Sequence, residues 1–338
     1  MKKSSQKIIT AVSFLFFVLA MTVFVWEGIY VPKAPNSKET KIFSVTKGER
    51  TKQISINLEK QGFIKYGFFF RFYVLTRGVA DKLQAGDYLL SPSMATPEIT
   101  KKLVSGDIVR EKITIIEGWN LRDIAFYLRE QELVTTIEFF KIVSLPKDFS
   151  KEFDFLKDKP KDLSLEGYLF PDTYETQEGE IAEEIVRKIL KNFDQKLNPE
   201  LREEIKKQDK TIFEIITMAS LIEEEVKTTP DKKLVSGILW KRLESGMPLQ
   251  VDATINYITG KKTTKVSAEE TKIDSPYNTY KYRDLPLGPI SNPGLESIIA
   301  AIYPQESEFW YYLSALDGET IFNKTFEKHN QAQAEYLK

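Results

Sequence analysis

The stretch Thr211-Ile-Phe-Glu-Ile-Ile-Thr-Met-Ala-Ser-Leu-Ile-Glu-Glu-Glu-Val226 has the apolar spacing of a core helix. A helix turns about 100° per residue, and this turn collects the apolar side chains on one face. The members of that face are Ile212, Ile215, Ile216, Ala219 and Val226. We therefore expect a helix packed into the interior here, with the rest of this half of the chain built around it.

One acidic residue falls inside this apolar face. Glu223 lies one turn after Ala219, whereas Glu224 and Glu225 project from other sides of the helix. Placing a carboxyl group in the core costs free energy unless it is neutral or hydrogen-bonded. Burial raises the pKa of such a group, as a general acid working near neutral pH requires. Three glutamates in a row are also typical of a solvated helix end, so the pattern favours Glu223 without establishing catalysis.

Polar loops follow this helix. Another helix is expected at about 230–245, ended by Gly246, and the segments 247–257, 275–280 and 285–294 are rich in amides, hydroxyls and aromatic rings. These are the groups that a sugar polymer needs in a binding groove, although Pro, Asn and Gly clusters also build ordinary turns. The candidate substrate contacts are Gln250, Asp252, Tyr277, Asn278, Tyr280 and Asn292.

Composition excludes several kinds of chemistry. The chain of 338 residues has 48 basic and 49 acidic side chains, a balance that argues against a nucleic-acid partner. It has no cysteine and one histidine, His329, so thiolate nucleophiles and zinc sites of several histidines are excluded. We expect no metal and no cofactor, and a packing or capping role for His329. The remaining chemistry is that of carboxylates, hydroxyls, amides and lysines.

The N-terminus is typical of a membrane anchor. Three lysines lie in residues 1–7, and Ile8–Trp26 contains no charge. A helix of this length, at about 1.5 Å per residue, just spans a hydrocarbon core of about 30 Å. The competing interpretation is a cleaved signal peptide, whose apolar region is usually shorter. The lysines predict a cytoplasmic N-terminus, a single-pass anchor in residues 1–30 and an extracytoplasmic remainder.

An internal repeat follows a polar tether at 31–41. Residues 45–64 align with residues 115–134 without a gap, so that Gly48 meets Gly118 and Leu58 meets Leu128. Each copy predicts a short strand, a glycine turn and an amphipathic helix. This arrangement resembles LysM domains and implies glycan binding. A duplicated structural unit without that function explains the pattern equally.

The expected fold class is α+β. A LysM-like repeat region is predicted at 42–145, a proline-broken and charged boundary at 145–162, and a mixed helical catalytic domain at 160–338. Near the end, apolar runs flank Asp317-Gly318, a pair that is typical of a β-hairpin.

Several ordered motifs resemble those of the endolytic murein transglycosylase (YceG-like) family. They are Ala219-Ser-Leu-Ile-Glu-Glu-Glu225, Pro248-Leu-Gln-Val-Asp-Ala-Thr-Ile255, Ser275-Pro-Tyr-Asn-Thr-Tyr280, Leu285-Pro-Leu-Gly-Pro-Ile-Ser-Asn-Pro-Gly294 and Phe326-Glu-Lys-His-Asn330. The similarity extends over about residues 42–338. It implies a LysM-like N-terminal part and a catalytic role for Glu223.

The resemblance also implies a reaction. A lytic transglycosylase of peptidoglycan cleaves the β-1,4 bond between N-acetylmuramic acid and N-acetylglucosamine and leaves a 1,6-anhydro end. One carboxyl group suffices for this, whereas hydrolytic glycosidases usually employ two. Anchoring at the cytoplasmic membrane would give the enzyme access to nascent strands, whose elongation it would terminate. Peptidoglycan synthases are then candidate partners.

Two alternatives stay open at this point. One is a hydrolytic muramidase with Asp252 as the second carboxylate, or more weakly Glu166. The other is a non-catalytic wall-binding scaffold in which the repeat is the functional part.

Overall fold

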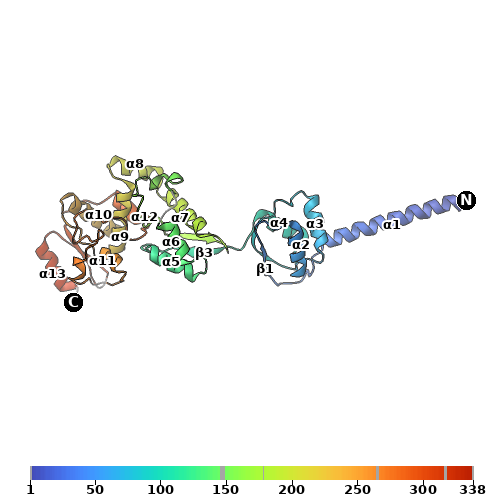
Figure 1. Cartoon of the computed structure of the whole chain (residues 1–338), viewed down its shortest axis with the longest axis horizontal. Coiled ribbons are helices and arrows are strands. Elements are labelled where there is room, and N and C mark those ends of the chain that lie inside the picture. Colours follow the sequence, from blue (N-terminus) through green and yellow to red (C-terminus); the bar gives the residue numbers. More distant parts are fainter. Residues whose placement is uncertain (1, 145–148, 178, 264–265, 316–317, 337–338) are drawn as a thin grey trace. The chain divides into compact units, whose positions relative to one another are not determined.

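The computed structural model describes residues 2–144, 149–177, 179–263, 266–315 and 318–336. Within these ranges it is a mixed α+β structure with thirteen α-helices and six short strands, paired into three two-stranded sheets (Figure 1). The chain divides into two compact units. Unit 1 is Met1–Glu111 with Glu175–Glu178, and unit 2 is Lys112–Tyr174 with Gly179–Lys338.

Unit 1 begins with α1 (Lys2–Tyr30). Its segment Ile9–Tyr30 has 22 residues, contains an 18-residue window with a mean hydropathy of 2.4, and is long and apolar enough to cross a membrane. This is consistent with a single-pass anchor.

The remainder of unit 1 is a small module with its own core. Its elements are β1 (Lys41–Val45), α2 (Thr51–Lys60), α3 (Gly67–Thr76), β2 (Gly86–Leu90) and α4 (Thr96–Ser105). The strands β1 and β2 pair antiparallel, with Phe43 opposite Tyr88. Both of these rings are fully buried, together with Leu58 of α2 and Phe70 of α3.

The same order of elements returns at the start of unit 2. It consists of β3 (Glu111–Thr114), α5 (Leu121–Glu130), α6 (Thr136–Val143) and β4 (Thr173–Thr176), and β3 pairs with β4. The helices α2 and α5 have ten residues each and begin at positions that the gapless alignment pairs. Gly48 and Gly118 both have a φ of 82°, a left-handed turn that glycine adopts without strain. The sequence repeat is thus a repeat of structure.

The other elements of unit 2 are mainly helical. They are η1 (Phe149–Lys151), η2 (Asp154–Leu156), α7 (Ala182–Lys196), α8 (Pro199–Lys207), α9 (Ile212–Glu225), α10 (Thr229–Glu244), α11 (Asp252–Thr259), η3 (Glu270–Lys272) and α12 (Leu295–Ile302). Helix α9 begins at a capping box in which Thr211 and Glu214 bond each other's backbone N–H groups.

Helix α9 is the centre of this core. All residues from Ile215 to Ile222 are buried, so the helix is covered on every side rather than on one face. Helices α10 and α12 pack against it and against each other. The indole N–H of Trp240 on α10 donates to the carbonyl of Ala301 on α12 at 3.0 Å. Burial decreases again in the last turn of α9, and Glu223 lies in that turn.

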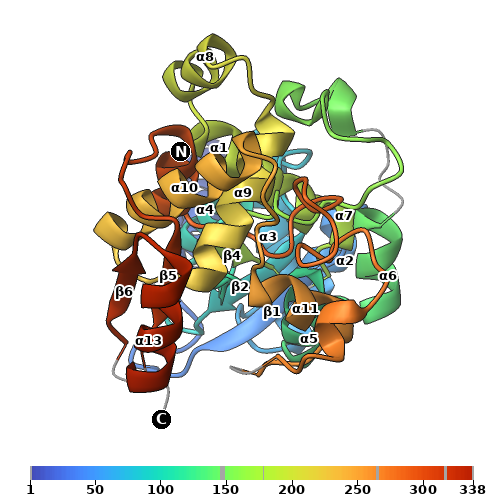
Figure 2. The same cartoon turned by 90° about the vertical axis from the view of Figure 1, so that its left-hand side faces the viewer.

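The C-terminal segment forms a small layer of its own. The strands β5 (Tyr311–Ser314) and β6 (Thr320–Asn323) pair antiparallel, and α13 (Phe326–Tyr336) packs on both (Figure 2). The turn predicted at Asp317-Gly318 falls partly outside the described residues.

Candidate active site

The carboxyl group of Glu223 has two partners at the end of α9. The ammonium group of Lys232, on α10, lies 3.1 Å from Oε1, and the backbone N–H of Gly294 donates to Oε2 at 2.9 Å. The Glu223 side chain is 8% exposed and that of Lys232 is 3% exposed. A buried carboxylate needs such compensation because it has lost its water. The two partners hold the carboxyl group in one orientation.

The loop that supplies Gly294 is bonded to α9 at a second point. The hydroxyl of Ser220 accepts the N–H of Ile290 at 3.1 Å, and the hydroxyl of Ser291 donates to the Ser220 carbonyl at 3.2 Å. Ser220 lies about one turn before Glu223, so one face of the helix binds both ends of the loop. The loop 290–294 is therefore positioned directly by the helix that carries the candidate acid.

Asn292 connects this loop to two further turns. Its side-chain carbonyl accepts the N–H of Leu169 at 2.8 Å, and its amide donates to the Trp119 carbonyl at 2.8 Å and to Glu166 at 3.2 Å. The Asn292 carbonyl also accepts the N–H of Gly118 at 3.0 Å. These bonds bring the glycine turn of the second repeat copy against the loop that holds Glu223.

Glu166 lies at the buried side of this network. Its carboxyl group accepts the N–H of Leu121, the first residue of α5, at 3.1 Å and the Tyr257 hydroxyl at 3.3 Å. Burial raises the pKa of Glu166 to about 8, against the lowering effect of those two donors. The side chain is buried, and its partners come from the start of α5, from α11 and from the 290–294 loop, so Glu166 joins these three elements.

A second carboxyl group lies beside Glu223. A Cβ atom added to Gly294 would overlap Oε1 of Glu117, so the Glu117 carboxyl group packs directly on that glycine. Burial raises the pKa of Glu117, and the negative charge of Glu223 raises it further while Lys232 lowers it. The carboxyl groups of Glu117 and Glu223 and the ammonium group of Lys232 thus lie within mutual electrostatic reach, with a smaller effect on Glu117 from Glu296.

A hollow of about 340 Å³ lies on the Glu224 side of the Gly118 turn. A Cβ atom on Gly118 would lie 3.0 Å from Oε1 of Glu224 and 3.9 Å from Cγ of Glu223, so the turn lies against both residues. The hollow is lined by Gly118, Asn120, Arg122, Asp123, Glu224, Ala253, Asn256, Tyr257, Gly260, Lys261, Lys262, Thr263 and Ile290. Its lining combines amide, aromatic and cationic side chains with the carboxyl groups of Asp123 and Glu224.

The neighbours of Glu223 in the glutamate run have surroundings of their own. Burial raises the pKa of Glu224 to about 7, although a hydrogen bond with Ser291 opposes the shift. Burial likewise raises the pKa of Glu225 to about 7, against the effect of the Tyr312 hydroxyl. Glu225 faces Asp252 and Tyr312, whereas Glu223 faces Lys232 and the 290–294 loop.

The six predicted substrate contacts divide into two groups. Asn278 and Asn292 are buried, and the Asn278 amide donates to the carbonyls of Thr271 and Ile273 at 3.0 and 2.7 Å. The other four are at least partly exposed: Gln250, Asp252, Tyr277 and Tyr280. The Tyr280 hydroxyl donates to Asp252, and the Tyr277 ring lies 5.0 Å from that of Tyr257. None of the six lines the hollow as the described residues define it.

Sequence reasoning missed Glu117, Lys232 and Ser220. A signal for Glu117 existed, because it follows the second-copy strand at the position that Lys47 occupies in the first copy. No sequence signal indicated Lys232, since a lysine near the start of a charged helix is usually solvated. Ser220 lies within the motif that singled out Glu223, but its two bonds to the 290–294 loop depend on tertiary structure.

Known proteins resemble this chain over nearly its whole length. The profile of the YceG-like family matches residues 43–335. A protein of Bacillus subtilis (strain 168) named endolytic murein transglycosylase is 33% identical over 321 residues, which cover 92% of this chain and 89% of that protein. A protein of the same name from Streptococcus pneumoniae (serotype 2, strain D39) is 32% identical over 358 residues, covering 96% of this chain and 65% of its own length.

A solved structure extends the agreement to the fold. The crystal structure of a protein from Listeria monocytogenes described as YceG-like has 35% sequence identity and a TM-score of 0.60, over 87% of this chain and 99% of that one. The family profile covers both the repeat copies and the helix that carries Glu223. This chain belongs to the YceG-like family.

Proposed function

We propose that this chain is a lytic transglycosylase that cleaves the glycan strands of peptidoglycan, with Glu223 as its acid and base. The names of the relatives in Bacillus subtilis and Streptococcus pneumoniae support the activity. The observation that carries the assignment of the residue is the position of Glu223, at the end of a buried helix, with Lys232 and the Gly294 N–H fixing its carboxyl group.

The proposed chemistry uses this one carboxyl group twice. Protonated Glu223 donates its proton to the glycosidic oxygen, and the C1–O4 bond of the N-acetylmuramic acid residue breaks. The substrate's 2-acetamido group stabilises the cation at C1. The Glu223 carboxylate then takes the proton of the C6 hydroxyl as its oxygen bonds to C1, which yields a 1,6-anhydro end and regenerates the acid.

Glu117 favours one competing reaction. A hydrolase employs a second carboxylate to activate water or to attack the sugar. Glu117 lies beside Glu223, whereas Asp252, the partner that the sequence indicated, faces Glu225. In the transglycosylase proposal, Glu117 instead adjusts the charge around Lys232 and Gly294. The two reactions give different products.

The setting of the enzyme is part of the proposal. Residues 1–30 anchor the chain in the cytoplasmic membrane with the N-terminus inside, and both repeat copies are LysM-like, in strand-helix-helix-strand order. Gln250, Asp252, Tyr277 and Tyr280 contact the glycan, while Asn278 and Asn292 shape the loops that present them. Anchoring favours nascent strands as substrate and synthases of those strands as partners.

Product analysis tests the reaction and the residue together. Purified peptidoglycan is digested with the native chain and with Glu223→Gln, Glu224→Gln and Glu117→Gln, and the ends are identified by mass spectrometry. We expect anhydro ends from the native chain and a loss of about 10²–10⁴-fold in rate for Glu223→Gln. Glu224→Gln is the comparison variant: Glu224 lines the hollow but does not pair with Lys232, so its loss should lower the rate far less than that of Glu223. Reducing ends that disappear in Glu117→Gln would establish hydrolysis instead.

A further inference from the structure

Helix α3 exposes large apolar side chains that its own module does not cover. Phe68 is 67% exposed, Phe72 43% and Leu75 61%, and these positions recur at the spacing of one helix face. The rings of Phe68 and Phe72 stack with their centroids 6.4 Å apart. The opposite face of α3, with Phe70 and Val74, is buried in the core of unit 1. A helix that is apolar on both faces is typical of a position between a protein core and a second apolar phase.

This exposed face is continuous with α1. The Phe69 ring lies 5.2 Å from that of Phe24, and a Cβ atom on Gly28 would overlap the Phe69 ring, so the two helices meet closely at that glycine. Phe24 and Gly28 belong to the apolar segment Ile9–Tyr30. Helix α3 therefore contacts the last turns of the span itself, rather than only the chain beyond it.

The acidic residue near the C-terminal end of α1, Glu27, has a basic partner in the module of unit 1. Lys65, just before α3, pairs with Glu27 of α1 at 3.4 Å. Trp26 and Tyr30 are exposed on the same turns of α1 and stack on each other. Aromatic rings and paired charges of this kind gather where a membrane helix leaves the hydrocarbon region.

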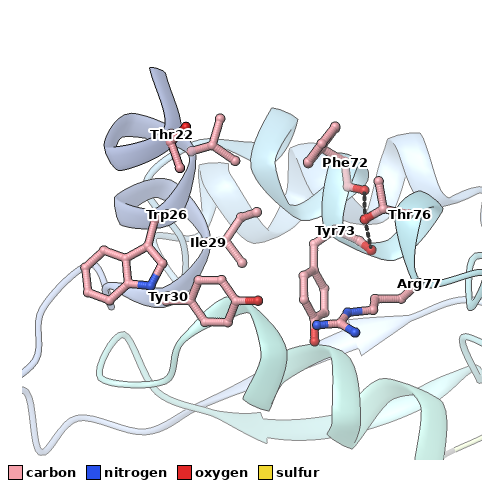
Figure 3. A pocket seen from close by; sticks show the side chains of 9 residues that line it. Thr22, Trp26, Ile29, Tyr30, Phe72, Tyr73, Thr76 and Arg77 are labelled. Atoms are coloured by element: carbon pink, nitrogen blue, oxygen red, sulfur yellow. Dashed lines mark hydrogen bonds between the residues drawn. The ribbon is translucent and has the colours of Figure 1, made fainter. Parts of the chain in front are cut away.

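Beside this contact, a groove of about 370 Å³ is lined by residues of both helices (Figure 3). Along α1 its lining changes from Thr22 and Val25 to Trp26, Ile29 and Tyr30. On the α3 side the Arg77 guanidinium lies 5.4 Å from the centroid of the Tyr73 ring and faces the hydroxyl groups of Tyr30 and Tyr73 (Figure 3). Among the described residues no carboxylate acts on Arg77. The groove is thus apolar toward the middle of α1 and cationic at the Tyr30 end, which matches the polarity of a phospholipid.

We propose that α3 lies in the interfacial region of the membrane that α1 crosses, with Phe68, Phe72 and Leu75 among the acyl chains and a phospholipid in the groove whose phosphate pairs with Arg77. This inference rests on the proposed anchor. It makes the first repeat copy a membrane-bound module, held at a fixed depth by two helices rather than one. Lipid binding of this kind gains from both apolar burial and attraction between cations and phosphates.

Depth measurements on the full-length chain test the position of α3. The chain has no cysteine, so a single one at position 15, 72 or 89 takes one fluorophore. Position 15 lies within α1, position 72 on the α3 face, and Leu89 on the exposed side of β2 in the same unit. In phospholipid vesicles containing nitroxide-labelled lipids, we expect strong quenching at 15 and 72 and several-fold weaker quenching at 89.

Labels at these three positions test the membrane anchor and the placement of α3 separately. Weak quenching at 15 would contradict the anchor, whereas strong quenching at 15 with weak quenching at 72 would contradict the placement of α3 alone. Cross-linking through position 72 to a second copy, without lipid quenching, would assign the face to a dimer contact and overturn the proposal.

Native mass spectrometry of the full chain released from phospholipid nanodiscs tests the groove. Arg77→Gln should lower the fraction of chains that retain a phospholipid several-fold. Arg71→Gln, within α3 but outside the groove lining, is the matched control and should retain the native fraction. Equal retention in the native chain and in Arg77→Gln would exclude the phosphate contact.

Discussion

Lys232 is the charged partner of the Glu223 carboxyl group. Its side chain is almost fully buried, so removing the ammonium group leaves a carboxylate without its charge partner. We predict that Lys232→Met lowers kcat on glycan strands by about 10²-fold, as a misplaced catalytic group does, with little change in KM. Steady-state kinetics on purified strands give this split.

Two further variants separate positioning from general destabilisation. Lys232→Arg restores a cation and should recover part of kcat, while Lys233→Met, next along α10, should behave as the native chain. If Lys232→Met reduced activity only near its melting temperature, Lys232 would be structural and not a positioning residue for Glu223.

Glu166 makes part of the stability depend on pH. Burial raises its folded-state pKa to about 8 from an ordinary 4.5, so folding favours its neutral form. The stability it contributes is complete below pH 4.5 and is lost as the pH rises to about 8. The melting temperature of Glu166→Gln should therefore fall less than that of the native chain across this range.

Thermal unfolding followed by circular dichroism at several pH values measures this difference. Glu130→Gln, at the exposed end of α5, is the control and should follow the native pH dependence. If the melting temperatures of the native chain and of Glu166→Gln changed equally with pH, the Glu166 carboxyl group would not be a source of the pH dependence of stability.

At the scale of single elements, the close approach of α10 to the 303–309 segment depends on one glycine. A Cβ atom on Gly237 would overlap the carbonyl oxygen of Gln305. Alanine is the better helix former by about 1 kcal/mol, but the backbone contact leaves no room for it. We predict that Gly237→Ala destabilises the chain by about 1–3 kcal/mol in denaturant unfolding.

Ser236 is the neighbouring control for that change. It is buried, and its hydroxyl has no hydrogen-bond partner among the described residues. Ser236→Ala should therefore leave stability unchanged or slightly raised. If Ser236→Ala destabilised the chain as much as Gly237→Ala, the lack of room for a Cβ atom at Gly237 would not be the cause of its effect.

The sequence predicted α2, α5 and α9 well, because the spacing of apolar residues or the alignment of the two repeat copies is enough to locate each of these helices. The gapless alignment of the two repeat copies placed α2 and α5 and their glycine turns, because each copy repeats the same hydrophobic spacing. The α9 prediction found the helix and singled out Glu223, but it underestimated burial, since Thr217 and Ser220 are polar in sequence and fully buried in the fold. Their hydroxyl groups bond to helix carbonyls, which makes that burial tolerable.

The partners of Glu223 could not be predicted in the same way. Lys232, Gly294 and Glu117 reach it from three elements that are distant in sequence, and no periodicity relates them. Asn292 illustrates the same limit: its residue type is suitable for sugar binding, but all three of its side-chain bonds go to the protein.

For the whole molecule, the separate main cores of the two units predict two separable unfolding steps. Leu58 is fully buried in the core of unit 1, and Leu128, its aligned partner, is fully buried in that of unit 2. Each Leu→Ala change removes the same atoms from the same place in a repeated element and should cost about 2–5 kcal/mol.

Differential scanning calorimetry of the full chain in detergent shows whether the two units unfold separately or together. Leu58→Ala should lower one transition and Leu128→Ala the other, with the second transition unmoved in each variant. A single transition that both substitutions lower equally would mean that the two units unfold as one.

The paired glycines of the two repeat copies have opposite surroundings. Chain neighbours aside, a methyl group added at Gly48 would meet no atom of the described residues within 4 Å, whereas Gly118 lies against Glu224 and Glu223. The first turn therefore has room for change, whereas the second is packed against the proposed catalytic glutamate and its neighbour. An epitope tag or a reporter peptide inserted at the first turn should be tolerated, and an insertion at the second should displace these two side chains.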